Sequence, residues 1–149
     1  MADLERLVRR LFDAIEARDV EQVRAMYTAD CKYVRSDGVS VGPEAIAAYL
    51  DGIVAAFPDH AYRIEAAHVA GDVITVEWTE TATHTEPYLS PNLGLIAPTG
   101  KRFELRIAEV IRFEGELVAS QHEYYDLLSL LRQVGWLGAV PAAQGAPAG

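Results

Sequence analysis

The segment 103–126 constrains the fold more than any other part of the chain. It reads FELRIAEVIRFEGELVASQHEYYD, two runs of alternating apolar residues on either side of Glu114-Gly115. An acidic residue followed by glycine between two such runs is typical of a tight turn, so the segment predicts a long antiparallel β-hairpin. Because side chains alternate between the two faces of a strand, the apolar residues of the first run gather on one face.

Several polar residues fall on that same predicted face. Glu109 shares it on the first arm, and simple alternation places Ser120, His122, Tyr124 and Asp126 together on one face of the second arm. Burying ionisable groups among apolar side chains costs free energy, so structure alone is a poor reason to place them there. The hairpin is therefore the first candidate for a site that carries chemistry.

Length and composition indicate one globular domain. The chain has 149 residues, half of them hydrophobic and 23% charged, and its net charge of −9 argues against nucleic acids and anionic membranes as partners. It contains neither an apolar run of about 18 residues nor a basic-then-apolar N-terminus, so we expect no membrane span and no signal peptide. The single cysteine, Cys31, fits a reducing compartment, and we expect a cytoplasmic protein with Cys31 in its core.

The first 58 residues predict three helices. Apolar residues over 4–15 follow the i, i+3, i+4 spacing of an amphipathic helix, with Asp3 as its N-cap. Asp19 begins a second, short helix, and Gly42-Pro43 begins a third that Pro58 ends. A short strand over 31–35 lies between the second and third helices.

The second half of the chain predicts the sheet on which these helices lie. Residues 61–70 and 73–85 alternate like strands, and 127–134 read as a short terminal helix. Residues 86–99 contain several prolines and large apolar side chains, so we interpret them as a long loop over the rim of the sheet that controls access to a ligand. The Ala/Gly/Pro-rich segment 141–149 predicts a disordered tail.

These elements predict a single α+β domain over residues 1–140. Long antiparallel strands twist strongly, so we expect the three N-terminal helices to pack in the concavity of a strongly curved, mostly antiparallel sheet. Such a sheet, closed on one side by helices, leaves a conical cavity for a small molecule.

The quoted residues also resemble a known family. The phrases AFPDHAYRIEAAHVAGDVITVEWTETATHTEP and PTGKRFELRIAEVIRFEGELVASQHEYYDLLSLLRQVGW resemble the SnoaL-like polyketide cyclases, within the nuclear-transport-factor-2-like and ketosteroid-isomerase-like superfamily. Phe57-Pro58-Asp59, Thr83-His84-Thr85 and Tyr125-Asp126 carry much of the resemblance, which covers roughly residues 3–137. It implies a cone-shaped fold of that superfamily, although one fold hosts many functions.

The resemblance also implies a catalytic pair. In these cyclases an aspartate on the last long strand is the proposed general acid/base, assisted by a polar residue such as histidine, and Asp126 and His122 match those positions. The ending ASQHEYYD departs from the more usual tryptophan-bearing ending and is one residue longer from the turn, which implies a β-bulge. Asp126 also has an alternative role as the N-cap of the helix that begins at Leu127.

Further polar and aromatic residues are candidates for substrate contacts. A one-residue slip of register would turn the two glutamates among them towards solvent. The candidates are Glu109, Trp78, His84, Tyr33, Tyr124, Phe57 and Glu80. We interpret His60 and His68 as surface or structural residues. The histidines show neither HxxxH nor HExxH spacing, so we expect no metal and no cofactor.

Three functions remain open from the sequence. The first is a cofactor-free cyclase or isomerase that acts on a small apolar carbonyl compound by acid/base catalysis. The second is a hydrolase resembling limonene epoxide hydrolase, whose Asp–Arg–Asp set is not evident here because Arg106 and Glu109 fall on opposite strand faces. The third is a non-catalytic small-molecule binding protein. For each we expect a homodimer that covers the outer face of the sheet.

Overall fold

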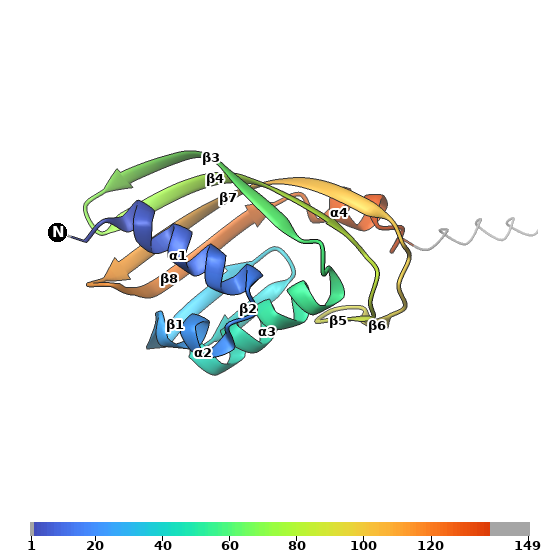
Figure 1. Ribbon diagram of the computed structural model, residues 1–149, viewed down its shortest axis with the longest axis horizontal. Helices are drawn as coiled ribbons and strands as arrows, with labels where there is room; N and C mark the ends of the chain where they lie inside the picture. Colours follow the sequence, from blue (N-terminus) through green and yellow to red (C-terminus); the bar gives the residue numbers. More distant parts are fainter. Residues whose placement is uncertain (1, 138–149) are drawn as a thin grey trace, which may run out of the picture.

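The computed structural model describes residues 2–137, which form the predicted α+β fold. A large curved sheet arches over α1 (Leu4–Glu16), and α3 (Pro43–Ala56) lies beside it towards the hairpin of β5 (Tyr88–Ser90) and β6 (Gly94–Ile96) (Figure 1). The predicted tail 141–149 and the last three residues of the predicted domain lie outside the described residues.

The three predicted N-terminal helices are present with their predicted caps. They are α1 (Leu4–Glu16), α2 (Val20–Ala25) and α3 (Pro43–Ala56). The Asp3 carboxylate accepts a hydrogen bond from the Arg6 backbone N–H, and Asp19 caps α2 in the same way. Helices α1 and α3 turn their apolar stripes towards the sheet, where they are buried, and α2 packs against α1 and α3.

The sheet has the order β2-β1-β8-β7-β4-β3, with all neighbours antiparallel except β1 and β8. The mostly antiparallel sheet is therefore confirmed, and the strand predicted at 31–35 is longer than expected. The strands are β1 (Tyr27–Arg35), β2 (Gly38–Val41), β3 (Ala61–Ala70), β4 (Val73–Thr83), β7 (Arg102–Glu114) and β8 (Leu117–Tyr125).

A β-bulge in β8 decides which side chains face the interior. Val118 pairs with Phe113 and Ser120 pairs with Arg112, so Ala119 is left without a partner on β7. The extra residue shifts the alternation by one position, because successive side chains on a strand point to opposite faces. The simple alternation expected for the second arm, with Ser120, His122 and Tyr124 inward, is therefore wrong.

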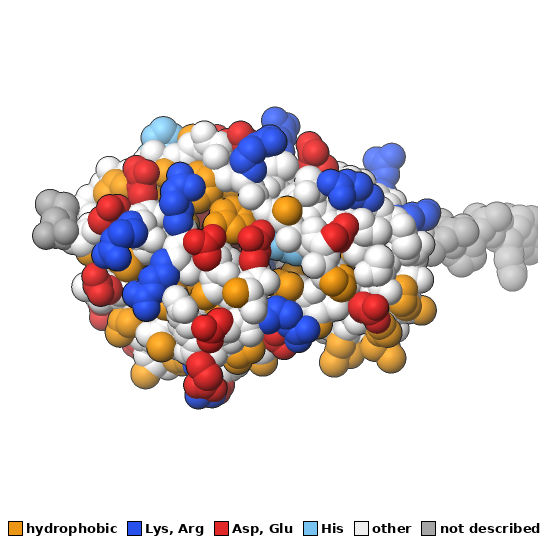
Figure 2. All heavy atoms as spheres, viewed as in Figure 1, with side chains coloured by type: hydrophobic (Ala, Val, Ile, Leu, Met, Phe, Trp, Pro, Cys, Tyr) orange, Lys and Arg blue, Asp and Glu red, His pale blue; other side chains and the backbone are white. Residues whose placement is uncertain are grey.

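The segment 86–99 is not the irregular loop that its prolines suggested. Within it, β5 (Tyr88–Ser90) and β6 (Gly94–Ile96) form a separate two-stranded hairpin. Tyr88 is buried, whereas Leu89 and Leu95 are exposed. Figure 2 shows apolar side chains on the surface where this hairpin lies. The prolines and the glycine of this segment therefore lie in and around a short hairpin, which lies below the open end of the sheet (Figure 1).

The short helix α4 (Leu127–Gln133) follows β8 directly. Its N-cap is Asp126, whose carboxylate accepts a hydrogen bond from the Ser129 backbone N–H at 2.9 Å. The capping role left open from the sequence is therefore the one that the structure shows. Within residues 2–137, every helix is too short or too polar to cross a membrane.

Removing this cap should measurably destabilise the protein. We expect Asp126→Ala to lower the free energy of unfolding by about 1 kcal/mol, whereas Asp126→Asn should change it little because asparagine caps nearly as well. Urea denaturation followed by circular dichroism measures both variants. Equal losses in the two variants would contradict the capping role.

Candidate functional site

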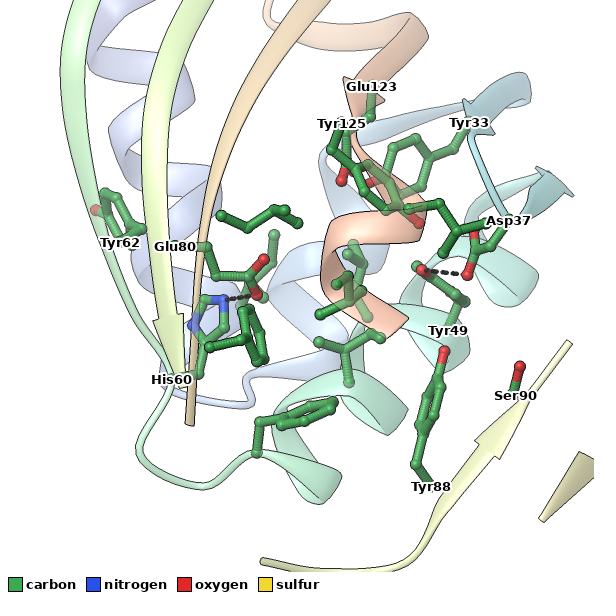
Figure 3. A pocket seen from close by; sticks show the side chains of 18 of the residues that line it. Tyr33, Asp37, Tyr49, His60, Tyr62, Glu80, Tyr88, Ser90, Glu123 and Tyr125 are labelled. Atoms are coloured by element: carbon green, nitrogen blue, oxygen red, sulfur yellow. Dashed lines mark hydrogen bonds and ion pairs between the residues drawn. The ribbon is translucent and has the colours of Figure 1, made fainter. Parts of the chain in front are cut away.

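A cavity of about 290 Å³ lies between the concave face of the sheet, the helices and the β5–β6 hairpin. Its walls are mainly apolar and aromatic, including Phe57, Trp78 and Leu105, while a few polar side chains enter it from different strands (Figure 3). This combination of an apolar wall with few polar groups is typical of a small-molecule site.

Two glutamates face each other in the wall. Glu109 on β7 and Glu123 on β8 are directly paired across the strands, so their side chains share the inner face. The Tyr33 hydroxyl donates a hydrogen bond to Glu123. The Gln121 amide N–H donates to Glu109 Oε2 at 3.2 Å, and the Tyr27 hydroxyl donates to the amide oxygen of Gln121.

Their surroundings favour the protonated forms of both glutamates. Glu109 is only 1% exposed, and burial raises its pKa well above the ordinary value, with the charge of Glu123 raising it further. Burial also raises the pKa of Glu123 to about 7, although the hydrogen bond from Tyr33 acts in the opposite direction. Two neighbouring carboxyls in an apolar site resist simultaneous ionisation. The pair therefore retains a proton near neutral pH.

Beside this pair, a hydrogen-bonded cluster holds two further polar groups, Asp37 and Tyr49, at the cavity. Arg35 Nε lies 3.0 Å from Asp37 Oδ1, and the Arg35 guanidinium stacks 3.5 Å above the centre of the Tyr49 ring. The Tyr49 hydroxyl in turn donates to Asp37 Oδ2 at 3.1 Å (Figure 3). Because Arg35 compensates Asp37, this cluster adds little net charge to the wall.

A second polar group lies on the other side of the cavity. His60 Nε2 and Glu80 Oε1 are 2.8 Å apart, and Figure 3 shows the pair well away from Glu123. The His60 side chain is only 8% exposed. Burial alone would lower its pKa, but the hydrogen bond and charge of Glu80 outweigh burial and raise it. The pair therefore favours a protonated histidine beside a carboxylate.

A family model described as "SnoaL-like polyketide cyclase" matches residues 5–134. The chain belongs to the SnoaL-like polyketide cyclase family. No curated protein matches the chain. The fold agrees with this assignment, because the helices, the curved sheet and the internal cavity are those expected from the resemblance.

Several solved structures share this SnoaL-like fold. AclR from Streptomyces galilaeus, a candidate hydroxylase, is 22% identical with a TM-score of 0.75, and the match covers 93% of this chain and 99% of AclR. IdmH from Streptomyces antibioticus, a candidate polyketide cyclase, is 18% identical with a TM-score of 0.74, over 90% of this chain and 99% of IdmH. TsrD from Streptomyces laurentii is 22% identical with a TM-score of 0.74, and the match covers 90% of this chain and 96% of TsrD.

Five of the predicted contact residues lie in the wall of the SnoaL-like cavity. They are Tyr33, Phe57, Trp78, Glu80 and Glu109. The apolar periodicity of the sequence predicted correctly the strand or helix end on which each of them lies. The inner faces of β4 and β7 also follow the predicted alternation of side chains without a shift. Whether these side chains contact a substrate stays a prediction.

The other four predicted site residues lie outside the cavity wall. The bulge turns His122 and Tyr124 to the outer face, where Tyr124 is 59% exposed, and Asp126 caps α4 instead of entering the cavity. His84 is fully buried behind the wall, where its Nδ1 accepts a hydrogen bond from Trp136 Nε1 at 3.2 Å. It supports Trp136, which does line the cavity.

Sequence reasoning missed Glu123, which simple alternation put on the opposite face, and also His60 and Asp37. Of the two roles expected for His60, surface or structural, the surface role is wrong, because its side chain is buried against Glu80. One signal for Glu123 was available: Val118-Ala119 are two consecutive apolar residues in an alternating strand, and both are buried. Such a doublet is what a bulge leaves in the sequence.

The raised pKa of Glu123 should appear in the pH dependence of stability. In the unfolded chain this group ionises near pH 4.5, whereas in the folded protein it stays protonated up to about pH 7. Ionisation of the unfolded state alone therefore favours unfolding between these two pH values. We expect Glu123→Gln to gain stability relative to the wild type as the pH rises from about 4.5 to about 7.

Urea denaturation of both proteins at several pH values measures this difference. Glu104→Gln is the matched control, since Glu104 is exposed on the face of β7 opposite to Glu109. A stability difference between Glu123→Gln and the wild type that does not change with pH would contradict the raised pKa.

Proposed function

We propose that this SnoaL-like protein is a cofactor-free acid/base enzyme that moves a proton at a carbon next to a carbonyl group. The reaction is an aldol-type cyclisation or an isomerisation of a small apolar carbonyl compound. The observation that carries the proposal is the pair Glu109 and Glu123 in an apolar cavity, where Glu123 has a pKa of about 7. A base with a pKa near the working pH is suited to both accept and return a proton.

In the proposed reaction the ionised Glu123 takes the proton from the α-carbon, and the C–H electron pair moves into an enolate. Glu109 stays protonated and donates a hydrogen bond to the enolate oxygen as its charge develops. Tyr33 orients Glu123 through its hydroxyl. For cyclisation, the enolate carbon forms a bond to a second carbonyl carbon, whose oxygen then takes a proton from the acid pair.

This proposal moves the acid/base role from Asp126 and His122 to the glutamate pair. It also ranks above a hydrolase with an Asp–Arg–Asp set, because Arg106 is exposed and lies on the face of β7 opposite to Glu109. Non-catalytic binding in the same cavity is the remaining alternative, and the experiment below separates it from catalysis.

Deuterium exchange into a simple ketone tests the proposal. 2-Acetonaphthone carries exchangeable methyl protons next to its carbonyl, and proton NMR in D₂O follows their loss. We expect the wild type to accelerate exchange, with a rate that increases through about pH 7 as Glu123 ionises. Glu123→Gln should lower the catalysed rate by about 10²–10⁴ because the amide cannot accept the proton.

Two variants serve as controls for this experiment. Glu104→Gln removes an exposed carboxyl from β7, and Asp126→Asn preserves the helix cap, so both should retain the wild-type rate. A wild-type protein that exchanges no faster than Glu123→Gln would favour the binding alternative. A large loss in Asp126→Asn alone would return the acid/base role to Asp126.

We also propose that the protein is a homodimer formed through the outer face of the sheet. Val110 and Tyr124 lie on this face on neighbouring strands and are 38% and 59% exposed. Apolar and aromatic surface on an open sheet face favours pairing with a second copy. Light scattering should give twice the chain mass and should give a lower mass for Tyr124→Glu. A monomeric wild type would contradict this proposal.

A further inference from the structure

The proposed reaction leaves the pair of Glu80 and His60 without a role. Glu80 projects from the inner face of β4, where its cross-strand partner on β7 is Leu105. Leu105 is four residues along β7 from Glu109, which corresponds to roughly 13 Å at the rise of a β-strand. Figure 3 shows Glu80 and His60 on one side of the cavity and Glu123 on another, and the charge of Glu80 still helps to raise the pKa of both Glu109 and Glu123.

His60 fixes one oxygen of Glu80 and leaves the other free for a ligand. His60 Nε2 lies 2.8 Å from Oε1, and the two side chains are 8% and 11% exposed. In the described part of the chain, the polar contact of the Glu80 carboxylate is the one from His60 to Oε1, and Oε2 has no protein donor. Because Glu80 lines the cavity, this oxygen is a hydrogen-bond acceptor without a protein donor at an apolar wall.

The charge near Glu80 indicates which kind of donor fits. His60 Nε2 already faces Oε1, and a second carboxylate, Glu16, lies 3.8 Å from His60 Nδ1. The protonated histidine lies between these two carboxylates and supplies a positive charge next to Glu80. A neutral hydroxyl group would bond to Oε2 without bringing a further cation into the wall, and hydrogen bonds to an ionised acceptor are strong.

We infer that Glu80 is a specificity-determining residue that accepts a hydrogen bond from a hydroxyl group of the substrate. The substrate class is then an elongated, largely apolar molecule with a carbonyl at the glutamate pair and a hydroxyl at the opposite end. The position of the carbonyl rests on the proposed function, whereas the hydroxyl site rests on Glu80 and His60 alone.

Three related ketones test this inference: 6-hydroxy-2-acetonaphthone, 6-methoxy-2-acetonaphthone and 2-acetonaphthone. They differ at the end of the ring system away from the carbonyl, where the first has a donor, the second only an acceptor and the third neither. Isothermal titration calorimetry at neutral pH measures each dissociation constant. We expect the wild type to bind the hydroxy compound about tenfold more tightly than either of the others.

Glu80→Gln gives the sharpest comparison. The new amide oxygen can still accept the hydrogen bond from His60, which turns the amide N–H₂ towards the cavity in place of Oε2. The free position thereby changes from an acceptor to a donor, and a donor can bond to the hydroxyl and to the methoxy oxygen alike, so the preference for the hydroxy over the methoxy compound should be lost. Glu77→Gln is the matched control, because Glu77 is an exposed glutamate on the opposite face of β4 and should retain the wild-type preference.

Two results would overturn the inference. One is a hydroxy compound that binds no more tightly than the other two ketones, including the case in which none of the three binds. The other is a Glu80→Gln variant that keeps the wild-type preference. Deuterium exchange separates this inference from the proposed function: hydroxyl selectivity without exchange would overturn only the reaction, and exchange without selectivity would overturn only the Glu80 site.

Discussion

The ladder between β7 and β8 holds the two halves of the sheet together. β8 joins the β1–β2 edge to the sheet, and β7 joins the β4–β3 edge, so every strand of the large sheet depends on this central pairing. The register of the ladder also decides the chemistry, because the bulge at Ala119 places Glu123 opposite Glu109. Without that extra residue, His122 would take the inward place.

Keeping two carboxyls in this interior costs free energy, and the surrounding strands offset part of it. Tyr33 on β1 donates to Glu123, while Gln121, itself held by Tyr27 of β1, donates to Glu109. The parallel β1–β8 pairing thus supplies the donors, and the antiparallel β7–β8 pairing supplies the acceptors. Burial still outweighs these bonds for both groups, which is why both pKa values are raised.

Most of the fold could be predicted from the sequence because apolar residues recur at the regular spacing of a helix or a strand. Helices α1 and α3 have unbroken apolar stripes with recognisable caps, and β4 and β7 alternate without interruption. The site could be predicted only in part, since it depends on a single irregular residue, Ala119, that reverses the faces of β8. His60 was missed for another reason: it precedes β3 in a turn, and only its contact with Glu80 across the strands reveals it.

The positions of the polar groups in the cavity bear on the orientation in which a substrate binds. A cavity with one polar end would bind an apolar ketone in either of two orientations, and only one of them would bring the α-carbon to the glutamate pair. A second polar end that accepts a hydroxyl, as we infer for Glu80, makes the two orientations unequal. Such orientation lowers the entropic part of the barrier without changing the chemical groups that transfer the proton. The pair of Glu80 and His60 would then act on the same reaction as Glu123 by fixing the substrate, from a backbone position roughly 13 Å along the sheet from the glutamate pair.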